Sequence, residues 1–308
     1  MKKNKKLCAI IGNCQAEILP KYLLTNAEFS DEYEIINIPG IYQLTQEEFI
    51  TGYGESLKDV ELLIYQPLSE RFGPLSSSNI SNLVSSLCKR ISFPSLFFTG
   101  YNPEVAYLRD KELRSLLYVD RFFWQLWKDK TPDLLVEKLN DLNFFPEWFS
   151  LMCVEESINE CIRRETSKGV NIIMSDFIKN NYKSKRLFHV LNHPSATIML
   201  ELSSRILSEL GFKPNTSPTP ISLDEGIMGE FSFPIYASHH KNLQLQFPRG
   251  EHRFFGNISV SHYIDVFSKE FEAKYNEIEE DSLRFSFTIP KSRTDVSIIG
   301  EMESELLF

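Results

Sequence analysis

Two short segments of the chain carry side chains suited to chemistry, and the first is Gly12-Asn13-Cys14-Gln15. It follows an apolar run directly, so we expect Cys14 where a strand turns into a helix. Unpaired N–H groups at a helix start favour a thiolate, which is the reactive form of cysteine. Gly12 permits a tight turn, and the Asn13 and Gln15 side chains can stabilise an oxyanion. The alternative is that Cys14 is a small buried apolar side chain, as most cysteines are.

The second segment runs from Phe188 to Ser195 and contains His193 directly before Pro194. We expect His193 at the cap of a long helix, where the proline would hold it rigidly. Imidazole titrates near neutral pH and can accept a proton from a thiol or hydroxyl. The alternative is a histidine that only caps the helix or fills space. His189 lies four residues earlier, a spacing that can serve zinc on a helix, but Pro194 places this segment before the helix, so no metal is expected.

A basic cluster lies near these histidines in an otherwise acidic protein. It consists of Lys183, Lys185 and Arg186. Clustered ammonium and guanidinium groups can hold the phosphates of a nucleotide-like cofactor. The alternative is an ordinary solvated face of the protein.

Four apolar, β-branched or aromatic runs alternate with helical or turn-rich stretches in the first hundred residues. They cover residues 7–12, 33–40, 60–68 and 91–100. Continuous apolar runs are typical of strands covered on both faces, so they predict a parallel, doubly wound sheet. Loops at 65–68 and 99–103, the second with Tyr101, follow two of these strands and either line a site at the sheet edge or are simple turns.

The rest of the chain is helical in pattern. Helices are predicted between residues 76 and 90, and over 103–117, 131–142, 153–168, 194–210 and 261–275. In the segment 194–210, Ile198, Leu202 and Ile206 form one apolar stripe and Gly211 follows the end. The fold class expected is therefore α/β, with a parallel Rossmann-like or SGNH-like sheet in the amino-terminal part and a helix-rich remainder.

Composition limits the class of protein. Of 308 residues, 42% are hydrophobic and 24% are charged, which excludes collagen-like and mostly disordered chains. The formal charge is −9, and the lysines and arginines are not segregated into one basic region. No nucleic acid partner is therefore expected. Five irregularly spaced cysteines do not form a disulfide scaffold and favour a cytoplasmic location. No apolar window approaches about 18 residues, so no membrane span is expected.

Three motifs together point to a known family: GNCQ at 12–15, TGYNP at 99–103 and NHPS at 192–195. With them, over roughly residues 6–250, the chain resembles the WcbI-type polysaccharide biosynthesis acetyltransferases. The resemblance implies coenzyme A or acetyl-coenzyme A as a substrate, a sugar or glycan as acetyl acceptor, and a place in capsule or surface polysaccharide biosynthesis. Cys14 and Gln15 match the amino-terminal motif of the family, and His193 matches its histidine. Motifs for dinucleotide, P-loop or zinc chemistry are absent from the sequence.

The chain is also similar to SGNH hydrolases, with Cys14 in place of their serine. The acid expected three residues before the histidine is missing, because Val190 stands there, so Asp176 becomes a candidate to orient His193. Three functions stay open: an acetyltransferase, a cysteine esterase or deacetylase of the same fold, and a non-catalytic module that binds coenzyme A or a glycan. We expect residues 1–260 to form the coenzyme A-binding domain and 261–308 an extension packed on it. The oligomeric state is not predicted.

Overall fold

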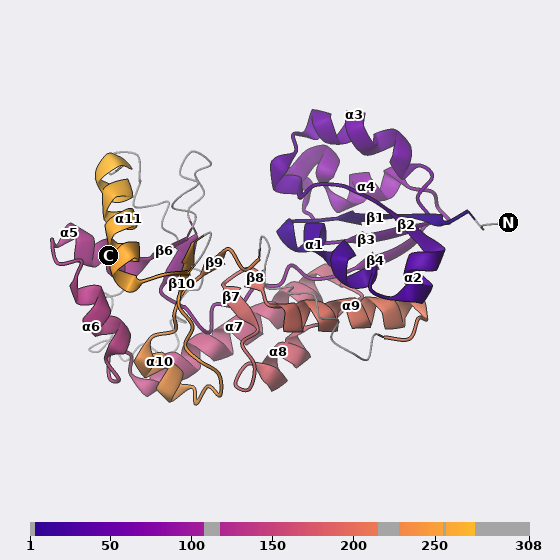
Figure 1. Ribbon diagram of the computed structural model, residues 1–308. Helices are drawn as coiled ribbons and strands as arrows, with labels where there is room; N and C mark the ends of the chain where they lie inside the picture. The colour runs from indigo at the N-terminus through magenta and orange to yellow at the C-terminus, as the bar shows by residue number, and fades with distance from the viewer. Residues whose placement is uncertain (1–3, 108–117, 215–227, 255–256, 275–308) are drawn as a thin grey trace. The chain divides into compact units, whose positions relative to one another are not determined.

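The computed structural model describes residues 4–107, 118–214, 228–254 and 257–274. Within the chain there are two compact units, each assembled from three segments (Figure 1). The first unit contains Met1–Phe97, Glu160–Tyr182 and Asn192–Gly229, and the second contains Phe98–Asn159, Lys183–Leu191 and Glu230–Phe308. The predicted division at residue 260 stays a prediction. Residues 275–308, most of the predicted extension, lie outside the described residues.

The first unit contains a four-stranded parallel sheet, as the sequence predicted. Its strands, in spatial order, are β2 (Tyr33–Ile36), β1 (Lys6–Ile11), β3 (Leu62–Tyr65) and β4 (Lys89–Ser92). The central strands are apolar at consecutive positions because helices cover both of their faces. Ala9 and Leu63, which are register partners on β1 and β3, are both completely buried.

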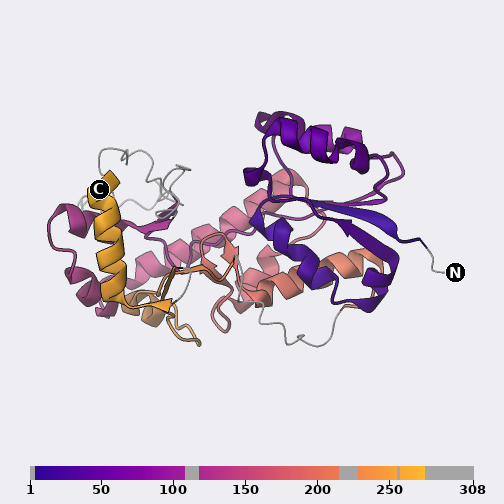
Figure 2. The ribbon, with the colours of Figure 1, turned by 45° about the horizontal axis from the view of Figure 1, so that its top comes forward.

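Helices lie on both faces of this sheet, which makes it doubly wound (Figures 1 and 2). The helices wholly within this unit are α1 (Cys14–Leu23), α2 (Ala27–Glu32), α3 (Gln46–Leu57), α4 (Ser77–Leu83), α8 (Ser175–Asn181) and α9 (Ala196–Leu210). The views place α3 and α4 on one face and α1 with α9 on the other. The predicted stripe of α9 is fully buried, and Gly211 ends the helix with a φ of 88°.

Two helix predictions need correction. The helix between 76 and 90 ends early, because α4 stops at Leu83 and Val84 is extended. Leu87, which continues the helical spacing of Leu83 and Val84, is 93% exposed. The predicted helix over 103–117 is wrong where it can be described. Residues Val105–Tyr107 form strand β5, which pairs antiparallel with β6 (Tyr118–Asp120), and 108–117 lie outside the described residues. A β-branched and aromatic segment takes up strand pairing when a partner is available.

The second unit is built from short strands, helices and an aromatic core. Its remaining elements include β7 (Phe188–Val190), β9 (Phe231–Ser232), β10 (His252–Phe254), β11 (Asn257–Ile258), α5 (Arg121–Lys128), α6 (Leu134–Asn140), α10 (Ala237–Asn242) and α11 (Val260–Lys274). Helix α7 (Glu147–Lys168) contributes residues to both units. Phe123 packs on Tyr263 and Phe271 with ring centroids 5.1 and 5.5 Å apart, and all three rings are buried. The helix predicted over 261–275 is confirmed by α11.

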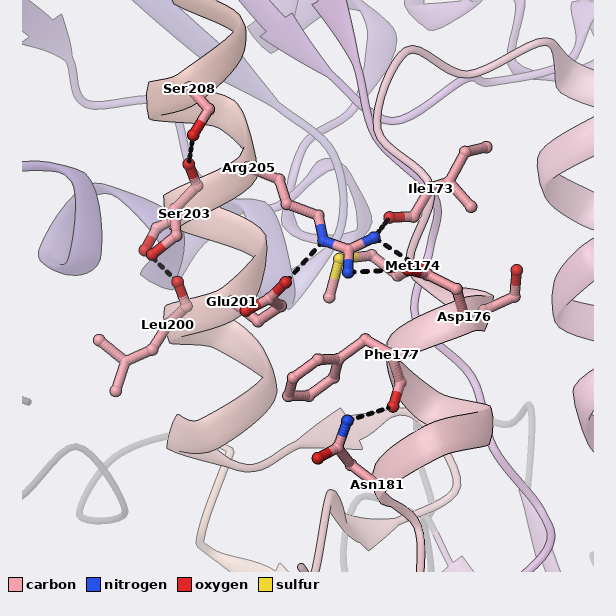
Figure 3. A network of polar contacts seen from close by, with 12 residues as sticks. Ile173, Met174, Asp176, Phe177, Asn181, Leu200, Glu201, Ser203, Arg205 and Ser208 are labelled. Atoms are coloured by element: carbon pink, nitrogen blue, oxygen red, sulfur yellow. Dashed lines mark hydrogen bonds and ion pairs between the residues drawn. The ribbon is translucent and has the colours of Figure 1, made fainter. Parts of the chain in front are cut away.

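A polar network joins α9 to α8 in the first unit (Figure 3). The Arg205 guanidinium donates to both carboxylate oxygens of Asp176, at 2.6 and 3.0 Å, and to the Ile173 carbonyl at 2.6 Å. It also donates to Glu201, one turn earlier on the same helix, at 2.7 Å. Asp176, the sequence candidate for orienting His193, therefore serves as a bidentate partner of Arg205.

Arg205→Met is expected to lower the free energy of unfolding by about 1 kcal/mol at neutral pH, since this partly exposed ion pair is solvent-screened. Arg205 lowers the pKa of Asp176 by hydrogen bonding. The carboxylate therefore stabilises the fold above its unfolded-state pKa, and that contribution is lost as pH falls through the lowered folded-state pKa. Urea unfolding of the wild type and of Arg205→Met, at pH 7 and near pH 3, measures the difference in the free energy of unfolding. Arg163→Met is the control with little expected change, because Arg163 is exposed and its partner Glu160 keeps a second ion pair with Arg164. An equal Arg205 effect at both pH values would contradict the expectation.

Candidate active site

The candidate site begins at the turn between β1 and α1. Strand β1 ends at Ile11, and α1 begins at Cys14 with Asn13 as its N-cap. The Asn13 Oδ1 accepts a hydrogen bond from the Gln15 backbone N–H at 2.9 Å, which satisfies one donor at the helix start. With strand order 2-1-3-4, the order reverses between β1 and β3. Open α/β sheets bind ligands at the carboxyl ends of the strands at such a reversal, so this turn occupies the expected position.

Gln66, the residue after β3, holds this turn in place. Its backbone N–H donates to the Ile11 carbonyl at 2.9 Å, and its side-chain oxygen accepts from the Asn13 N–H at 2.8 Å. A Cβ at Gly12 would lie 2.5 Å from that oxygen, so only glycine allows this approach. The polar residue predicted to follow the third strand does lie at this edge, and the turn requires glycine at position 12.

Gln15 is completely buried and uses its whole amide group. Its Nε2 donates to the carbonyls of Leu96 and Asn192, at 2.7 and 2.8 Å. Its Oε1 accepts from the Leu96 N–H at 2.9 Å and from Gln66 Nε2 at 3.0 Å. Both amide hydrogens are therefore committed to backbone carbonyls. The structure gives Gln15 a positioning role, and its role as an oxyanion donor stays a prediction.

The environment of Cys14 opposes the expected thiolate. The residue is only 9% exposed, and burial, followed by the negative charge of Glu17, raises the pKa of the thiol to about 12. Hydrogen bonds from the backbone N–H groups of Cys14 and Gln15 lower the pKa, as predicted for a helix start, but they are the smaller effect. Cys14 is therefore a neutral thiol at pH 7.

His193 lies before the helix rather than at its cap. It forms the short strand β8 (His193–Pro194), and Ser195 is the N-cap of α9, so the predicted cap assignment was wrong. The His193 side chain is 5% exposed. Gln15, next to Cys14, donates to the carbonyl of Asn192, next to His193, so the residues adjoining the two candidates are in contact. A shared pocket for the thiol and the imidazole stays a prediction.

The basic candidates and Tyr101 belong to the second unit. Lys185 is exposed and Lys183 is half-buried. The Arg186 guanidinium is largely buried and donates to the backbone carbonyls of residues 188, 189, 233 and 249 and to the Ser232 hydroxyl. Tyr101 is buried and donates to the Lys185 carbonyl at 3.0 Å. Their roles in binding a cofactor stay predictions, and Arg186 has a structural task as well.

Sequence reasoning missed three residues beside Cys14: Glu17, Tyr42 and Gln43. Glu17 follows Cys14 by three positions, so a helical reading of 14–23 places both on one face. Tyr42 and Gln43 come from η1 (Ile41–Gln43), which the sequence did not single out. Only the tertiary fold brings them to the carboxylate.

No three His, Cys, Asp or Glu side chains of the described residues gather to hold a metal ion. None of the helices within those residues is long and apolar enough to cross a membrane.

The protein belongs to the α/β class, and its parallel sheet carries a cysteine-bearing turn at the point where the strand order reverses. The family model described as the polysaccharide biosynthesis enzyme WcbI matches residues 7–215. The chain therefore belongs to the WcbI family, and the resemblance in its motifs is confirmed.

A solved structure shares this fold. It is described as WcbI, a novel polysaccharide biosynthesis enzyme, in its native form without a disulfide bond between coenzyme A and its own Cys14. The match covers 91% of this chain and 92% of that one, with 21% sequence identity and a TM-score of 0.71. The α/β fold class is thereby confirmed. No curated protein matches the chain significantly.

Proposed function

We propose that this protein transfers the acetyl group of acetyl-coenzyme A to a sugar hydroxyl during polysaccharide biosynthesis. The observation that carries the proposal is the Cys14 turn, held by Gln66 and Gln15 at the β1/β3 switch point of a WcbI-family chain. The solved WcbI structure supports the proposal, because that protein is described together with coenzyme A and with a Cys14 of its own. The described cysteines are all free thiols, in keeping with a cytoplasmic location.

In this proposal His193 is the general base. It removes the proton from the acceptor hydroxyl while the oxygen attacks the thioester carbonyl carbon. The carbon–sulfur bond then breaks, and coenzyme A leaves as a thiolate that recovers the proton from the imidazolium. Asn13 Nδ2, which donates to Ser95 Oγ at 3.1 Å at the half-buried start of α1, is the side-chain candidate for stabilising the oxyanion. Each bond broken is matched by one formed, so no further reactant is needed.

Cys14 has a binding role in this scheme. A neutral buried thiol is a poor nucleophile, because the thiolate is the form that attacks a thioester. An acetyl-cysteine intermediate would also replace one thioester by another, with little gain in reactivity. We therefore assign direct transfer, with Cys14 packed beside the thioester of the bound donor.

The two alternative functions, an esterase or deacetylase and a binding module, differ from the transferase in their use of coenzyme A and in their products. An esterase or deacetylase would release acetate from an acetylated sugar without coenzyme A. A binding module would bind coenzyme A without turnover. Isothermal calorimetry with acetyl-coenzyme A, followed by an assay of acceptor-dependent thiol release, separates them. Heat of binding with acceptor-dependent release supports the transferase. Absence of binding with acetate release from acetylated sugars would replace it by the esterase.

We propose that Lys183 and Lys185 contribute to binding the phosphates of coenzyme A. The double variant Lys183→Ala/Lys185→Ala should bind coenzyme A about tenfold more weakly at low ionic strength, with a smaller difference at high salt. Arg186 is left intact because its buried guanidinium supports the backbone around it. Calorimetry across a salt series measures the effect, and Lys179→Ala, in the last turn of α8, is the control. If the wild type and the double variant bound coenzyme A equally well at every salt concentration, the two lysines would simply be part of a solvated face and would not contact the phosphates.

A further inference from the structure

The second unit contains a pocket of about 490 Å³ that the proposed reaction does not use. It is formed by the end of α6, the loop 249–251, strands β10 and β11 and the start of α11. Its volume lies in the range of small-molecule sites, roughly 300–1,000 Å³. The polar side chains that line it are those of Asn140, Arg249, Glu251, His252, Asn257 and Ser259.

His252 presents a buried imidazole to this pocket. The side chain is 2% exposed, and no described residue places a polar atom within hydrogen-bond distance of either ring nitrogen. Burial lowers the pKa of His252 to about 3, so the ring is neutral at pH 7 and has one donor and one acceptor. Buried donors and acceptors without partners are costly, so a ligand or a water is the expected partner of these nitrogens.

A small cavity of about 10 Å³ also borders His252, together with Tyr263 and Ser232. It has room for about one water. One water cannot serve both nitrogens, because they point in different directions from the ring. At least one nitrogen therefore remains for a molecule bound in the larger pocket.

The imidazole is held in a fixed orientation. It stacks on Tyr263, with ring centroids 4.1 Å apart and planes 13° apart, and meets the edge of the Phe233 ring at 5.6 Å. Its backbone is fixed as well, since His252 pairs with Ile258 across the β10–β11 ribbon. The ring therefore does not have to be ordered when a ligand binds, which favours affinity.

The Arg249 guanidinium is also held in place. Its Nη1 donates to the Leu139 carbonyl at 2.6 Å and its Nη2 to Asn140 Oδ1 at 2.8 Å. A guanidinium has five N–H donors, so Arg249 keeps donors for a ligand. The Glu251 carboxylate, two residues further on, is exposed and supplies acceptors.

The chemistry of the lining indicates the class of ligand. The charges of Arg249 and Glu251 balance, so the pocket does not select for an anion. Donors and acceptors occur together, which suits hydroxyl groups, because each hydroxyl both donates and accepts. Pro234, Ile258 and Val260 add apolar surface for C–H groups. A ring that carries many hydroxyls and has apolar C–H faces matches all three features.

We propose that this pocket binds a neutral saccharide through His252, Arg249 and Glu251. The chain belongs to a family of polysaccharide biosynthesis enzymes, which supports a saccharide as the hydroxyl-rich ligand. The inference goes beyond the proposed acetyl transfer and does not depend on it. Because the ligand is uncharged, its affinity should change little with ionic strength.

The test is an NMR titration of the protein, labelled with ¹³C in its histidines, in the absence of acetyl-coenzyme A. The probes are the methyl pyranosides of glucose, galactose and mannose, and the His252 signal is the one lost in His252→Phe. We expect at least one probe to shift this signal with a Kd of about 1 mM, at low and at high salt alike. No shift with any of the three probes, at concentrations far above that value, would overturn the inference.

Variants separate binding from structure. His252→Phe keeps the ring stack on Tyr263 and removes only the nitrogens. The affinity for the probe, followed by saturation-transfer NMR, should fall about tenfold while the thermal midpoint does not fall. Glu251→Ala should raise the Kd read from the His252 signal by a similar factor. His262→Phe on α11 and Glu137→Gln on α6, both at exposed positions, are the matched controls and should bind as wild type.

Equal affinity in wild type, His252→Phe and Glu251→Ala would place the sugar elsewhere and contradict the inference. So would salt-dependent binding of glucuronate without binding of the neutral probes. The outcome is distinct from that of the proposed function. Acetyl transfer without a shift of the His252 signal removes only this pocket, and a bound saccharide without acetyl transfer removes only the proposed function.

Discussion

Replacing His193 with alanine is expected to lower turnover of acetyl transfer by about 10²–10⁴-fold, because the variant has no general base to remove the proton of the acceptor hydroxyl. Affinity for acetyl-coenzyme A should change little, since the proton transfer takes place at the acceptor. The measurement is thiol release at saturating donor and acceptor, with donor affinity determined separately by calorimetry.

Two variants bracket this result. His262→Ala removes an exposed histidine near the start of α11 and should keep wild-type turnover. Cys14→Ser should keep the fold and lose activity only mildly, since transfer is direct. If His193→Ala retained turnover within a few-fold of wild type, the imidazole would not be the base. A severe loss in Cys14→Ser, together with an acetyl adduct on Cys14 of the wild type, would support a covalent route instead.

Replacing Gln15 with leucine is expected to lower the free energy of unfolding by roughly 3 kcal/mol or more. The leucine would remove four hydrogen bonds at once from a completely buried position. It would leave the Leu96 backbone N–H, both accepting carbonyls and the Gln66 amide without their partners. The side-chain volume is similar, so a cavity adds little to the expected loss.

Urea denaturation measures this loss, with an unchanged slope indicating that the unfolded state is the same. Gln46→Leu, at the exposed start of α3, is the control and should change the stability by less than about 0.5 kcal/mol. We also expect Gln15→Leu to lose acetyl transfer, because Gln15 joins the cysteine turn to the segment that carries His193. A loss of less than about 1 kcal/mol would show that the buried amide is not needed to hold the turn.

Much of the fold was predictable because local patterns and the tertiary structure agree. Four consecutive apolar runs indicated a parallel sheet, and the stripe of Ile198, Leu202 and Ile206 indicated α9. Helix predictions failed where contacts with distant parts of the chain, such as a neighbouring strand, decide the structure. Residues 105–107 satisfy a helical pattern but form β5 because β6 is beside them, and Leu87 continues a helical spacing beyond the point where α4 ends.

Only those parts of the site that lie close together in the sequence could be predicted. A glycine, an N-cap asparagine and a cysteine after an apolar strand identified the turn at the sheet edge. Sequence could not show that Gln66 fills the space above Gly12, because those residues are far apart in the chain. The helix start favours a thiolate at Cys14, but the burial of the thiol, which arises from the tertiary fold, raises its pKa by more.

The central claim is tested most directly by following ¹³C-labelled acetyl-coenzyme A in a rapid-quench reaction with a pool of sugar acceptors, using mass spectrometry of both protein and products. We predict that the label appears on an acetylated sugar as coenzyme A is released, while the mass of the protein stays unchanged. Tight binding of acetyl-coenzyme A with no labelled sugar across a broad acceptor pool would contradict the account. So would label held on Cys14 and discharged to the acceptor at the rate of turnover.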